Sequence, residues 1–499
     1  MSAQEFDVIV VGGGMGGMVT AALLAAKESR RILVLEKEGL LGGRATSFVG
    51  AELTSWEEYK RRLGGAARTR LHRTIPDPET IIEKRLQDGY VFEAGIHGIF
   101  PWGRISHILN AIGRPIPLAP NDAAVWYHDG RFFPVRRGEP LPWMSERDLR
   151  ESKNVVREML RTGTRHAEEY DHVPLKEWLL ARTDSERAVE FHNVMGGINL
   201  TLTDLAKMSA GDNIKINRQC ILAGYHMSAG GTGAVGEPGY RMVFHRFADA
   251  VRQAGGAVRT NSRVREILVR NQRVRGVSVQ DPSGDYEAYA PVVISNIPIQ
   301  NTFHVLPENL FPSEWVQRVT GFWSAGGLCA TFGLRRPMLR EAAYVPKLLR
   351  AAEAETDADL FYIYWPSSAW APTRAPLGEQ LIEGYVPLTE AETRSKVILD
   401  RVCDAILAFM RRAHPTFDQD LKWVVFPVTN FLCGVAPAPS QVGDAKPEIR
   451  SPYVEGLCFS GDTVRGWGCA ADAAVHAGLL CATAVGKDDY LELVPEFMR

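Results

Sequence analysis

The fold of this chain is decided by the stretch Val8-Ile9-Val10-Val11-Gly12-Gly13-Gly14-Met15-Gly16-Gly17, followed downstream by Leu33-Val34-Leu35-Glu36. Together they predict a buried strand, a glycine turn, a helix, a second strand and then an acidic residue, which is the complete dinucleotide-binding βαβ context. Gly12 permits the tight turn, Gly14 lets the backbone approach a pyrophosphate, and Gly17 lets the helix pack close to the sheet. The sequence therefore predicts a Rossmann-like unit that binds a dinucleotide.

The helix expected over residues 15–28 and the acid after the second strand each have a part in this binding. The helix is rich in Ala and Leu, and its N-terminal N–H groups and positive dipole end would point at the phosphates. Glu36 stands 19 positions after Gly17, where a carboxylate can accept hydrogen bonds from the adenosine ribose hydroxyls. An ordinary glycine-rich turn would not meet all these requirements together.

A second glycine pair indicates a flavin rather than a nicotinamide. Gly42-Gly43-Arg44 begins six residues beyond Glu36, where the ribityl-diphosphate arm of a flavin would pass. Two glycines permit close backbone approach, and the Arg44 guanidinium can neutralise a diphosphate with its planar fork. The predicted cofactor is therefore FAD.

A motif near the C-terminus supports the same cofactor. Residues 457–462 are predicted to form a strand ending in Gly461-Asp462, and Gly466-Trp467-Gly468 precedes an Ala-rich helical run over 469–485. The Asp462 carboxylate can hold ribityl or diphosphate hydroxyls, and the helix N-terminus would face the pyrimidine edge of the flavin. Trp467 is expected to pack against the ring or the substrate, and Cys469 to be a small buried residue rather than a redox thiol.

Together these motifs resemble the flavin-containing amine oxidase superfamily, and most closely its phytoene desaturase and carotenoid isomerase branch. Phe92-Glu93-Ala94-Gly95-Ile96-His97 resembles the strand that re-enters the flavin site, although the family usually has Asp where Glu93 stands. Residues 173–179, 239–258 and 292–296 resemble further family segments, and Val264 stands where the family makes a backbone contact to adenine. The match spans the chain but leaves the interior of the substrate domain mostly unmatched.

The resemblance implies an α/β fold, in which an FAD-binding Rossmann-like βαβ domain of the glutathione-reductase type is interleaved with an α+β substrate-binding domain. We expect residues 1–100, 236–300 and 440–499 in the FAD-binding domain, and 101–235 and 301–439 in the substrate-binding domain. Alternating runs around a polar turn predict a β-hairpin over 266–279. Helical patterns dominate 146–195 and 390–413, whereas 360–365 and 423–426 are predicted strands.

Between Arg44 and Phe92 the chain is longer than the usual family link, and residues 50–88 are expected to form a lid-like basic insertion. From Lys60 to Arg73 the chain carries six Lys or Arg residues and no acidic residue. A solvated charged face is the ordinary explanation of such a run. The alternatives are an anion-binding or membrane-headgroup patch, or a surface for an oligomer contact or a partner subunit.

Composition narrows the class of protein. With 499 residues the chain can hold two hydrophobic cores, and its net charge of −2 argues against nucleic acid as a partner. Seven scattered cysteines without a CxxC pair indicate a cytoplasmic protein and predict neither a disulfide framework nor a metal site. The sequence shows no signal peptide and no apolar run as long as a membrane span. Isoprenoid substrates, which the resemblance implies, leave peripheral membrane contact open.

The residues expected to hold FAD are Gly12, Gly13, Gly14, Met15, Gly16, Gly17, Glu36, Lys37, Gly43, Arg44, Gly95, Ile96, Val264, Gly461, Asp462, Trp467, Gly468, Cys469 and Ala470. His97 is the candidate catalytic residue, because it follows Gly95-Ile96 where the family's chain passes the flavin ring. An imidazole there can accept a proton or steer the flavin's charge, and a structural histidine is the alternative.

The predicted chemistry comes mainly from the cofactor, which accepts a hydride at N5 while the protein holds a C–H bond over the ring and excludes water. Because an unactivated isoprenoid C–H needs no strong base, the site can be almost wholly apolar. In residues 360–365 strand alternation puts Phe361, Ile363 and Trp365 on one face and Tyr362 and Tyr364 on the other. At most one of these sets can line a pocket.

The sequence thus predicts an FAD-dependent oxidoreductase that introduces, saturates or shifts a C=C bond in an apolar isoprenoid or alicyclic substrate. One alternative is dehydrogenation next to a carbonyl, with Tyr362 or Tyr364 and His97 as an acid–base pair. A second is an amine oxidase, although the tyrosine cage of those enzymes is absent near the C-terminal motif. A third is a flavoprotein subunit that serves as a scaffold or partner. The motifs do not specify the electron acceptor.

Cys433 raises the question of a covalent flavin. It stands 28 residues before Gly461, similar to where monoamine oxidases carry their flavin-linked cysteine. Desaturases use no such bond, and the residues around Cys433 do not match those oxidases. A non-covalent flavin is therefore favoured.

Overall fold

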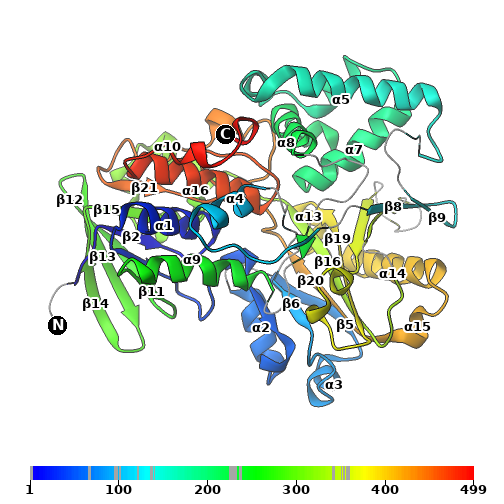
Figure 1. Cartoon of the computed structure of the whole chain (residues 1–499), viewed down its shortest axis with the longest axis horizontal. Coiled ribbons are helices and arrows are strands. Elements are labelled where there is room, and N and C mark those ends of the chain that lie inside the picture. The colour runs from blue at the N-terminus through cyan, green and yellow to red at the C-terminus, as the bar shows by residue number, and fades with distance from the viewer. Residues whose placement is uncertain are drawn as a thin grey trace.

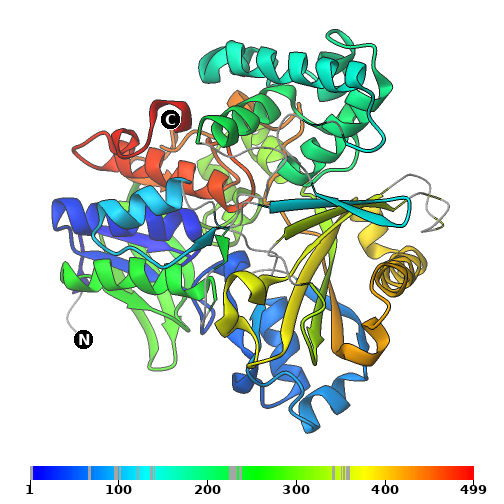
Figure 2. The ribbon, with the colours of Figure 1, turned by 45° about the vertical axis from the view of Figure 1, so that its right-hand side comes forward.

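The computed structural model describes residues 4–65, 69–94, 99, 103–120, 123–134, 139, 141–223, 233–234, 239–339, 343–349, 351, 355 and 360–499. Two large sheets organise these residues. Figure 1 shows a parallel sheet on the side of the molecule where both chain ends lie, and a larger sheet on the other side. Figure 2 shows the helices of residues 146–222 above the larger sheet.

The parallel sheet is the core of the predicted Rossmann-like unit. Its strand order is β11-β3-β2-β15-β21, and every neighbouring pair is parallel. The strands are β2 (Val8–Val11), β3 (Ile32–Leu35), β11 (Ala257–Arg259), β15 (Val292–Ser295) and β21 (Leu457–Phe459). The two central strands are continuous runs of buried Val and Ile or Leu, as expected where both faces of a parallel sheet are covered.

Helices and a second, four-stranded sheet complete this half of the molecule. The helices are α1 (Met15–Glu28), α4 (Arg104–Ala111), α9 (Arg241–Gln253), α10 (Ser313–Thr320) and α16 (Ala471–Val485). The second sheet joins β1 (Gln4–Glu5), β12 (Arg263–Arg270), β13 (Arg273–Asp281) and β14 (Gly284–Tyr289), and it shares one hydrophobic core with the parallel sheet. The predicted hairpin is confirmed as β12 and β13, which turn at Asn271 and Gln272, both with positive φ.

The larger sheet has eight strands in the order β5-β20-β16-β19-β18-β17-β8-β9. These strands are β5 (Thr69–Ile75), β8 (Ala123–His128), β9 (Arg131–Pro134), β16 (Gly326–Leu334), β17 (Ala343–Leu349), β18 (Leu360–Trp365), β19 (Gln380–Leu388) and β20 (Leu421–Thr429). One face packs on α14 (Lys396–Ala413), which α13 (Glu390–Arg394) precedes. The strands predicted over 360–365 and 423–426 are both present.

A group of helices packs beside the opposite face of this sheet. It comprises α5 (Glu146–Ala167), α6 (Leu175–Leu180), α7 (Glu186–Leu200) and α8 (Ala210–Leu222). Ile198 of α7 packs against Phe361, Ile363, Trp365 and Tyr385 of the sheet. Among the helices of the described ranges, none is long and apolar enough to cross a membrane.

The segment 50–88 is not a lid, which corrects the sequence expectation. It holds α2 (Trp56–Gly64), strand β5 and α3 (Pro78–Glu83), and β5 pairs antiparallel with β20 at the edge of the eight-stranded sheet. It is followed by β6 (Val91–Glu93), which pairs with β4 (Ser47–Val49). The sequence analysis did not predict strand β5, because the basic residues of this segment suggested a solvated surface.

Four of these basic side chains pair with acids rather than forming a free patch, three of them within α2 itself and one with α14. Arg62 Nη2 lies 2.7 Å from Glu58 Oε1, and Arg73 Nη1 lies 2.6 Å from Asp404 Oδ1 on α14. Lys60 Nζ lies 2.9 Å from Glu57 Oε1, whereas Arg68 falls outside the described residues. This pairing weakens the anion-binding alternative for the segment.

Candidate active site

A cavity of about 770 Å³ lies between the parallel sheet, the eight-stranded sheet and α7. The start of α1, the carboxyl ends of β3 and β15, strand β12 and the start of α16 line one part of it. Residues of α7, β8, β18 and β19 line the other part. Ligands of open parallel sheets bind beyond the carboxyl ends of the strands, which is where this cavity lies.

The glycine turn after β2 has the geometry that the sequence predicts. Gly12 has a φ of +100°, which favours glycine, and its N–H donates to the Leu35 carbonyl at 2.8 Å. A Cβ on Gly17 would lie 2.9 Å from Val10 Cγ1, so the small residue lets α1 approach the sheet. Gly14 precedes α1 and no side chain caps the helix, so the N–H groups of its first turn open on the cavity.

Glu36 lies at the end of β3 and lines the cavity. Its Oε2 accepts from the Gly13 N–H and its Oε1 accepts from the Glu38 N–H, both at 2.8 Å. Burial raises the pKa of Glu36, although the two N–H donors oppose that shift. A carboxylate has about four acceptor positions, so two remain for the hydroxyls of a ribose.

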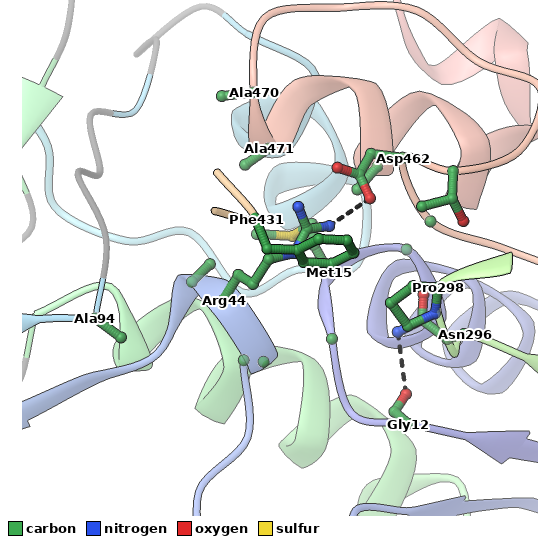
Figure 3. Close-up of a pocket in the computed structure, with 18 of the residues that line it drawn as sticks. Gly12, Met15, Arg44, Ala94, Asn296, Pro298, Phe431, Asp462, Ala470 and Ala471 are labelled. Carbon is green, nitrogen blue, oxygen red and sulfur yellow. Dashed lines mark hydrogen bonds and ion pairs between the residues drawn. The ribbon is translucent and has the colours of Figure 1, made fainter. Parts of the chain in front are cut away.

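Arg44 and Asp462 form an ion pair at the edge of the same cavity (Figure 3). The Arg44 guanidinium also lies 4.9 Å from the centre of the Phe431 ring, and Asp462 Oδ2 accepts from the Gly434 N–H at 2.7 Å. Burial alone would raise the pKa of Asp462, but Arg44 and this N–H outweigh it and lower the pKa. The sequence assigned the two residues separate contacts, whereas the structure pairs them with each other.

The start of α16 forms another wall. The helix has no side-chain cap at Ala470, whose φ is +48°, so the N–H groups of its first turn are left for a ligand. Behind it, the Asp472 carboxylate pairs with Arg104 and accepts from Gln219 Nε2 at 3.0 Å. Cys469, Ala470 and Asp472 line the cavity.

Trp467 does not face the cavity, contrary to the sequence expectation. The centre of its ring lies 4.1 Å from the Arg104 guanidinium carbon, and its backbone N–H donates to His476 Nδ1 at 3.2 Å. It therefore supports the start of α16 from behind. Neighbouring Gly468 has a φ of +144° and is likewise absent from the described lining.

The structure brings most of the predicted cofactor residues together around one cavity. The lining includes Gly12, Gly14, Met15, Gly16, Glu36, Lys37, Gly43, Arg44, Val264, Gly461, Asp462, Cys469 and Ala470. Gly13 and Gly17 support the turn from behind. Gly95, Ile96 and His97 lie outside the described residues, so the catalytic role of His97 stays a prediction.

Sequence reasoning missed Asn296 as a site residue. Its Nδ2 donates to the Gly12 carbonyl at 3.1 Å and so holds the glycine turn (Figure 3). The signal was present, since Asn296 directly follows β15, the strand that pairs with β2. Trp126, Met195, Ile198, Asn199 and Tyr385 were also missed, because they come from separate elements that only the fold brings together.

The predicted alternation of β18 is confirmed. Ile363 and Trp365 line the cavity, and Tyr385 of β19 lies beside them. Tyr362 and Tyr364 point to the opposite face, into the core against α14, where burial raises the pKa of both. Neither hydroxyl can act in the cavity, which corrects the acid–base pair suggested for them.

The side chain of Cys433 also does not line the cavity. Its Sγ lies 2.9 Å from Thr201 Oγ1, and burial raises the pKa of the thiol. Cys433 is not among the described lining residues, whereas its neighbours Phe431 and Leu432 are. The arrangement gives no support for a covalent flavin at this position.

Residues 15–486 of this chain match the profile of the flavin containing amine oxidoreductase family. The chain belongs to that family. This membership confirms the predicted cofactor, FAD, and the predicted α/β fold agrees with solved structures of similar architecture. The chain superposes with a TM-score of 0.67 on an oxidoreductase from Methanosarcina mazei, at 16% identity, covering 95% of this chain and 98% of that one.

Two sequence relatives agree with the predicted branch. The chain is 23% identical over 444 residues to the all-trans-retinol 13,14-reductase of Homo sapiens, covering 83% of this chain and 63% of that protein. It is 39% identical over 93 residues to the chloroplastic prolycopene isomerase 2 of an Oncidium hybrid cultivar, covering 16% of each. The chain thus spans less than two thirds of the length of these relatives.

Proposed function

We propose that this flavoenzyme introduces, saturates or shifts a C=C bond in an apolar isoprenoid or alicyclic substrate. The observation that carries the proposal is the apolar wall of the cavity opposite the glycine turn. Trp126, Met195, Ile198, Ile363 and Trp365 form this wall, and each is at least mostly buried. The names of the two relatives, a retinol reductase and a prolycopene isomerase, point to the same class of substrate.

FAD fits the described residues. Two helix N-termini without side-chain caps, those of α1 and α16, open on one cavity, as binding a diphosphate and a flavin pyrimidine edge requires. We assign the diphosphate to the start of α1 and to Arg44, and the adenosine ribose to Glu36. When bound, FAD supplies the group that accepts or donates a hydride.

The residues of the wall bind and orient the substrate and exclude water. Trp365 is 1% exposed and Trp126 is 6% exposed, so the surrounding protein holds both rings in place and each presents only a small apolar edge to a substrate. Exclusion of water protects a reactive carbon centre and strengthens the electrostatic effect of the α16 N-terminus. The reaction therefore depends more on how the substrate is positioned against the flavin than on a strong base.

Amine oxidation is less well supported. Among the described residues that line the cavity, the carboxylates are those of Glu36, Asp462 and Asp472. Glu36 accepts two backbone N–H groups, Asp462 pairs with Arg44, and Asp472 pairs with Arg104. None is left at the apolar wall to hold an ammonium group.

The proposal is tested by adding an isoprenoid, a cyclic ketone and an amine in turn to the FAD-loaded protein under anaerobic conditions. We expect the isoprenoid or the alicyclic compound to change the oxidation state of the flavin, seen in its visible spectrum, or to have its C=C bond shifted while the flavin ends unchanged, seen by product analysis. Reduction by the amine alone would contradict the proposal. If all three compounds and the flavin stay unchanged in both flavin oxidation states, a scaffold role is favoured.

A further inference from the structure

Among the described residues, a polar side chain adjoins the apolar wall at the C-terminal end of α7. Asn199 lies there, it lines the cavity, and it is 8% exposed. Its Nδ2 donates to Asn217 Oδ1 at 3.3 Å. The described residues offer its carboxamide oxygen no donor, so this oxygen is a nearly buried acceptor at the cavity surface. Since Asn199 Oδ1 is not among the fully buried atoms without a partner, it faces the cavity space, where a bound ligand or a water can donate a hydrogen bond to it.

The orientation of this carboxamide is fixed by a chain of asparagines. Asn217 uses its Nδ2 to donate to the Asn213 backbone carbonyl at 2.8 Å, so its Oδ1 must face Asn199. Asn199 then has to present its Nδ2 to Asn217, because two amide oxygens cannot bond each other. The oxygen of Asn199 is therefore the end left for the cavity.

The neighbouring hydroxyls do not supply the missing donor. The Tyr385 hydroxyl donates to the Ile198 carbonyl at 3.5 Å, and the Thr201 hydroxyl donates to the Leu200 carbonyl at 2.6 Å. Both protons thus have backbone carbonyls within reach at the same end of α7. This end of the cavity presents an acceptor, which suits a ligand with an O–H group better than a ketone, an ether or a hydrocarbon.

We propose that Asn199 accepts a hydrogen bond from a hydroxyl at one end of the substrate, so that the enzyme acts on an isoprenoid or alicyclic alcohol. This inference rests on the proposed function and makes its substrate class narrower. The apolar wall would hold the hydrocarbon part of the substrate. The hydrogen bond from its hydroxyl to Asn199 would fix which carbon of the substrate lies beside the flavin. Asn199 is therefore a specificity-determining residue.

The test compares geranylgeraniol with its methyl ether, which keeps the oxygen but lacks the O–H donor. Dissociation constants for the FAD-loaded protein are measured from the quenching of tryptophan fluorescence, since Trp126 and Trp365 line the cavity. We expect the wild type to favour the alcohol, and Asn199→Leu to lower the alcohol-to-ether preference about tenfold, the effect of one buried hydrogen bond. Comparing ratios between variants cancels the difference in size between the two ligands.

Two further variants sharpen the test. Asn217→Leu does not touch the cavity, but it frees the Asn199 carboxamide to rotate and present its NH₂ group. In Asn217→Leu we expect the ether to bind more tightly than in the wild type and the alcohol-to-ether preference to fall. Asn193→Leu makes the same substitution on α7 at a residue absent from the described lining, and should keep the wild-type ratio.

The outcomes separate the two claims. If both ligands bind but Asn199→Leu leaves their ratio unchanged, the hydroxyl assignment is wrong while the proposed function stands. If Asn199→Leu loses FAD and keeps the ratio, the carboxamide serves the cofactor and the assignment is also wrong. If neither ligand binds the wild type or affects its flavin, the proposed function fails, and the inference fails with it.

Discussion

Arg44 and Asp462 lie 418 positions apart in the chain and form an ion pair at the edge of the cofactor cavity. The pair joins the second glycine motif to the C-terminal one. Its geometry means that Asp462 orients Arg44, and that the guanidinium has N–H donors left for a diphosphate.

Arg44→Met should therefore weaken FAD binding about 10- to 100-fold, because it removes a charged donor and leaves Asp462 buried and unpaired beside an anionic ligand. Asp462→Asn in the same chain should restore part of the loss, since it removes the uncompensated charge. Titration of the apoprotein with FAD measures both effects. Additive losses in the double variant would show that the two residues act independently.

Gly16→Ala should disrupt the contact between α1 and the Gly461 turn. An added Cβ would lie 2.5 Å from the Gly461 backbone nitrogen, which has no flexible side chain to move away. We expect a loss of about 1–3 kcal/mol in the free energy of unfolding, together with lower FAD occupancy. Gly64→Ala is the matched control, since its Cβ would meet only the Thr69 carbonyl at 3.8 Å. Equal behaviour of the two variants would contradict the tight contact.

Arg374 lies between two buried carboxylates. Its Nη2 is 2.9 Å from Glu93 Oε1 and its Nη1 is 3.1 Å from Glu383 Oε2. Arg374→Met should cost about 3–5 kcal/mol of unfolding free energy, because it removes the positive charge that pairs with two buried carboxylates. Exposed Arg394→Met should leave the urea midpoint almost unchanged. A similar small effect at Arg374 would mean that the carboxylates find other partners.

The same ion pair explains why Glu93 departs from the family's usual Asp. The longer side chain reaches Arg374, and its Oε1 also accepts from the Tyr240 N–H at 3.3 Å. Glu93→Asp should withdraw the carboxylate from Arg374 and lower thermal stability. An unchanged melting temperature would remove this explanation.

Stability should fall as the pH is lowered from about 6.5 to about 4, because His192, His414 and His476 are buried without charge and burial lowers the pKa of each. Burial lowers the pKa of His192 and of His414 to about 4, from the ordinary 6.5. Between these values the unfolded chain binds a proton that the folded chain does not, so each histidine costs about 1 kcal/mol per pH unit on acidification. Urea unfolding at pH 7 and pH 5 measures this.

His192→Gln and His414→Gln should each flatten that pH dependence, whereas exposed His166→Gln should not. A pH profile that neither buried variant changes would show that other groups govern acid stability.

The sequence predicted the cofactor half well because its signals are local. The turn of Gly12 to Gly17 and the acid Glu36 carry their geometry in a short stretch, and 13 of the predicted cofactor residues line the cavity. The substrate half gave no such signal. Asn199 and Tyr385 belong to a helix and a strand with ordinary core patterns, and only the fold places them at one cavity.

Two errors have a common physical cause. The basic residues around strand β5 suggested a solvated surface, and Trp467 between two glycines suggested a ring contact. In both cases distant partners decide the outcome: Asp404 of α14 pairs with Arg73, and Arg104 covers the indole of Trp467. Ion pairs and cation–π contacts between residues far apart in the chain produce no periodic pattern from which a sequence analysis could predict them.

The most direct test of the account is a single turnover under anaerobic conditions. Chemically reduced, FAD-loaded protein and oxidised protein are each mixed with one equivalent of an unsaturated isoprenoid alcohol, and the flavin spectrum and the product mass are followed together. The account predicts that one flavin changes oxidation state for each C=C bond gained or lost, or that the bond shifts with the flavin required but unchanged at the end. An unchanged substrate in both flavin states, with the oxidised flavin reduced only by an amine, would contradict it.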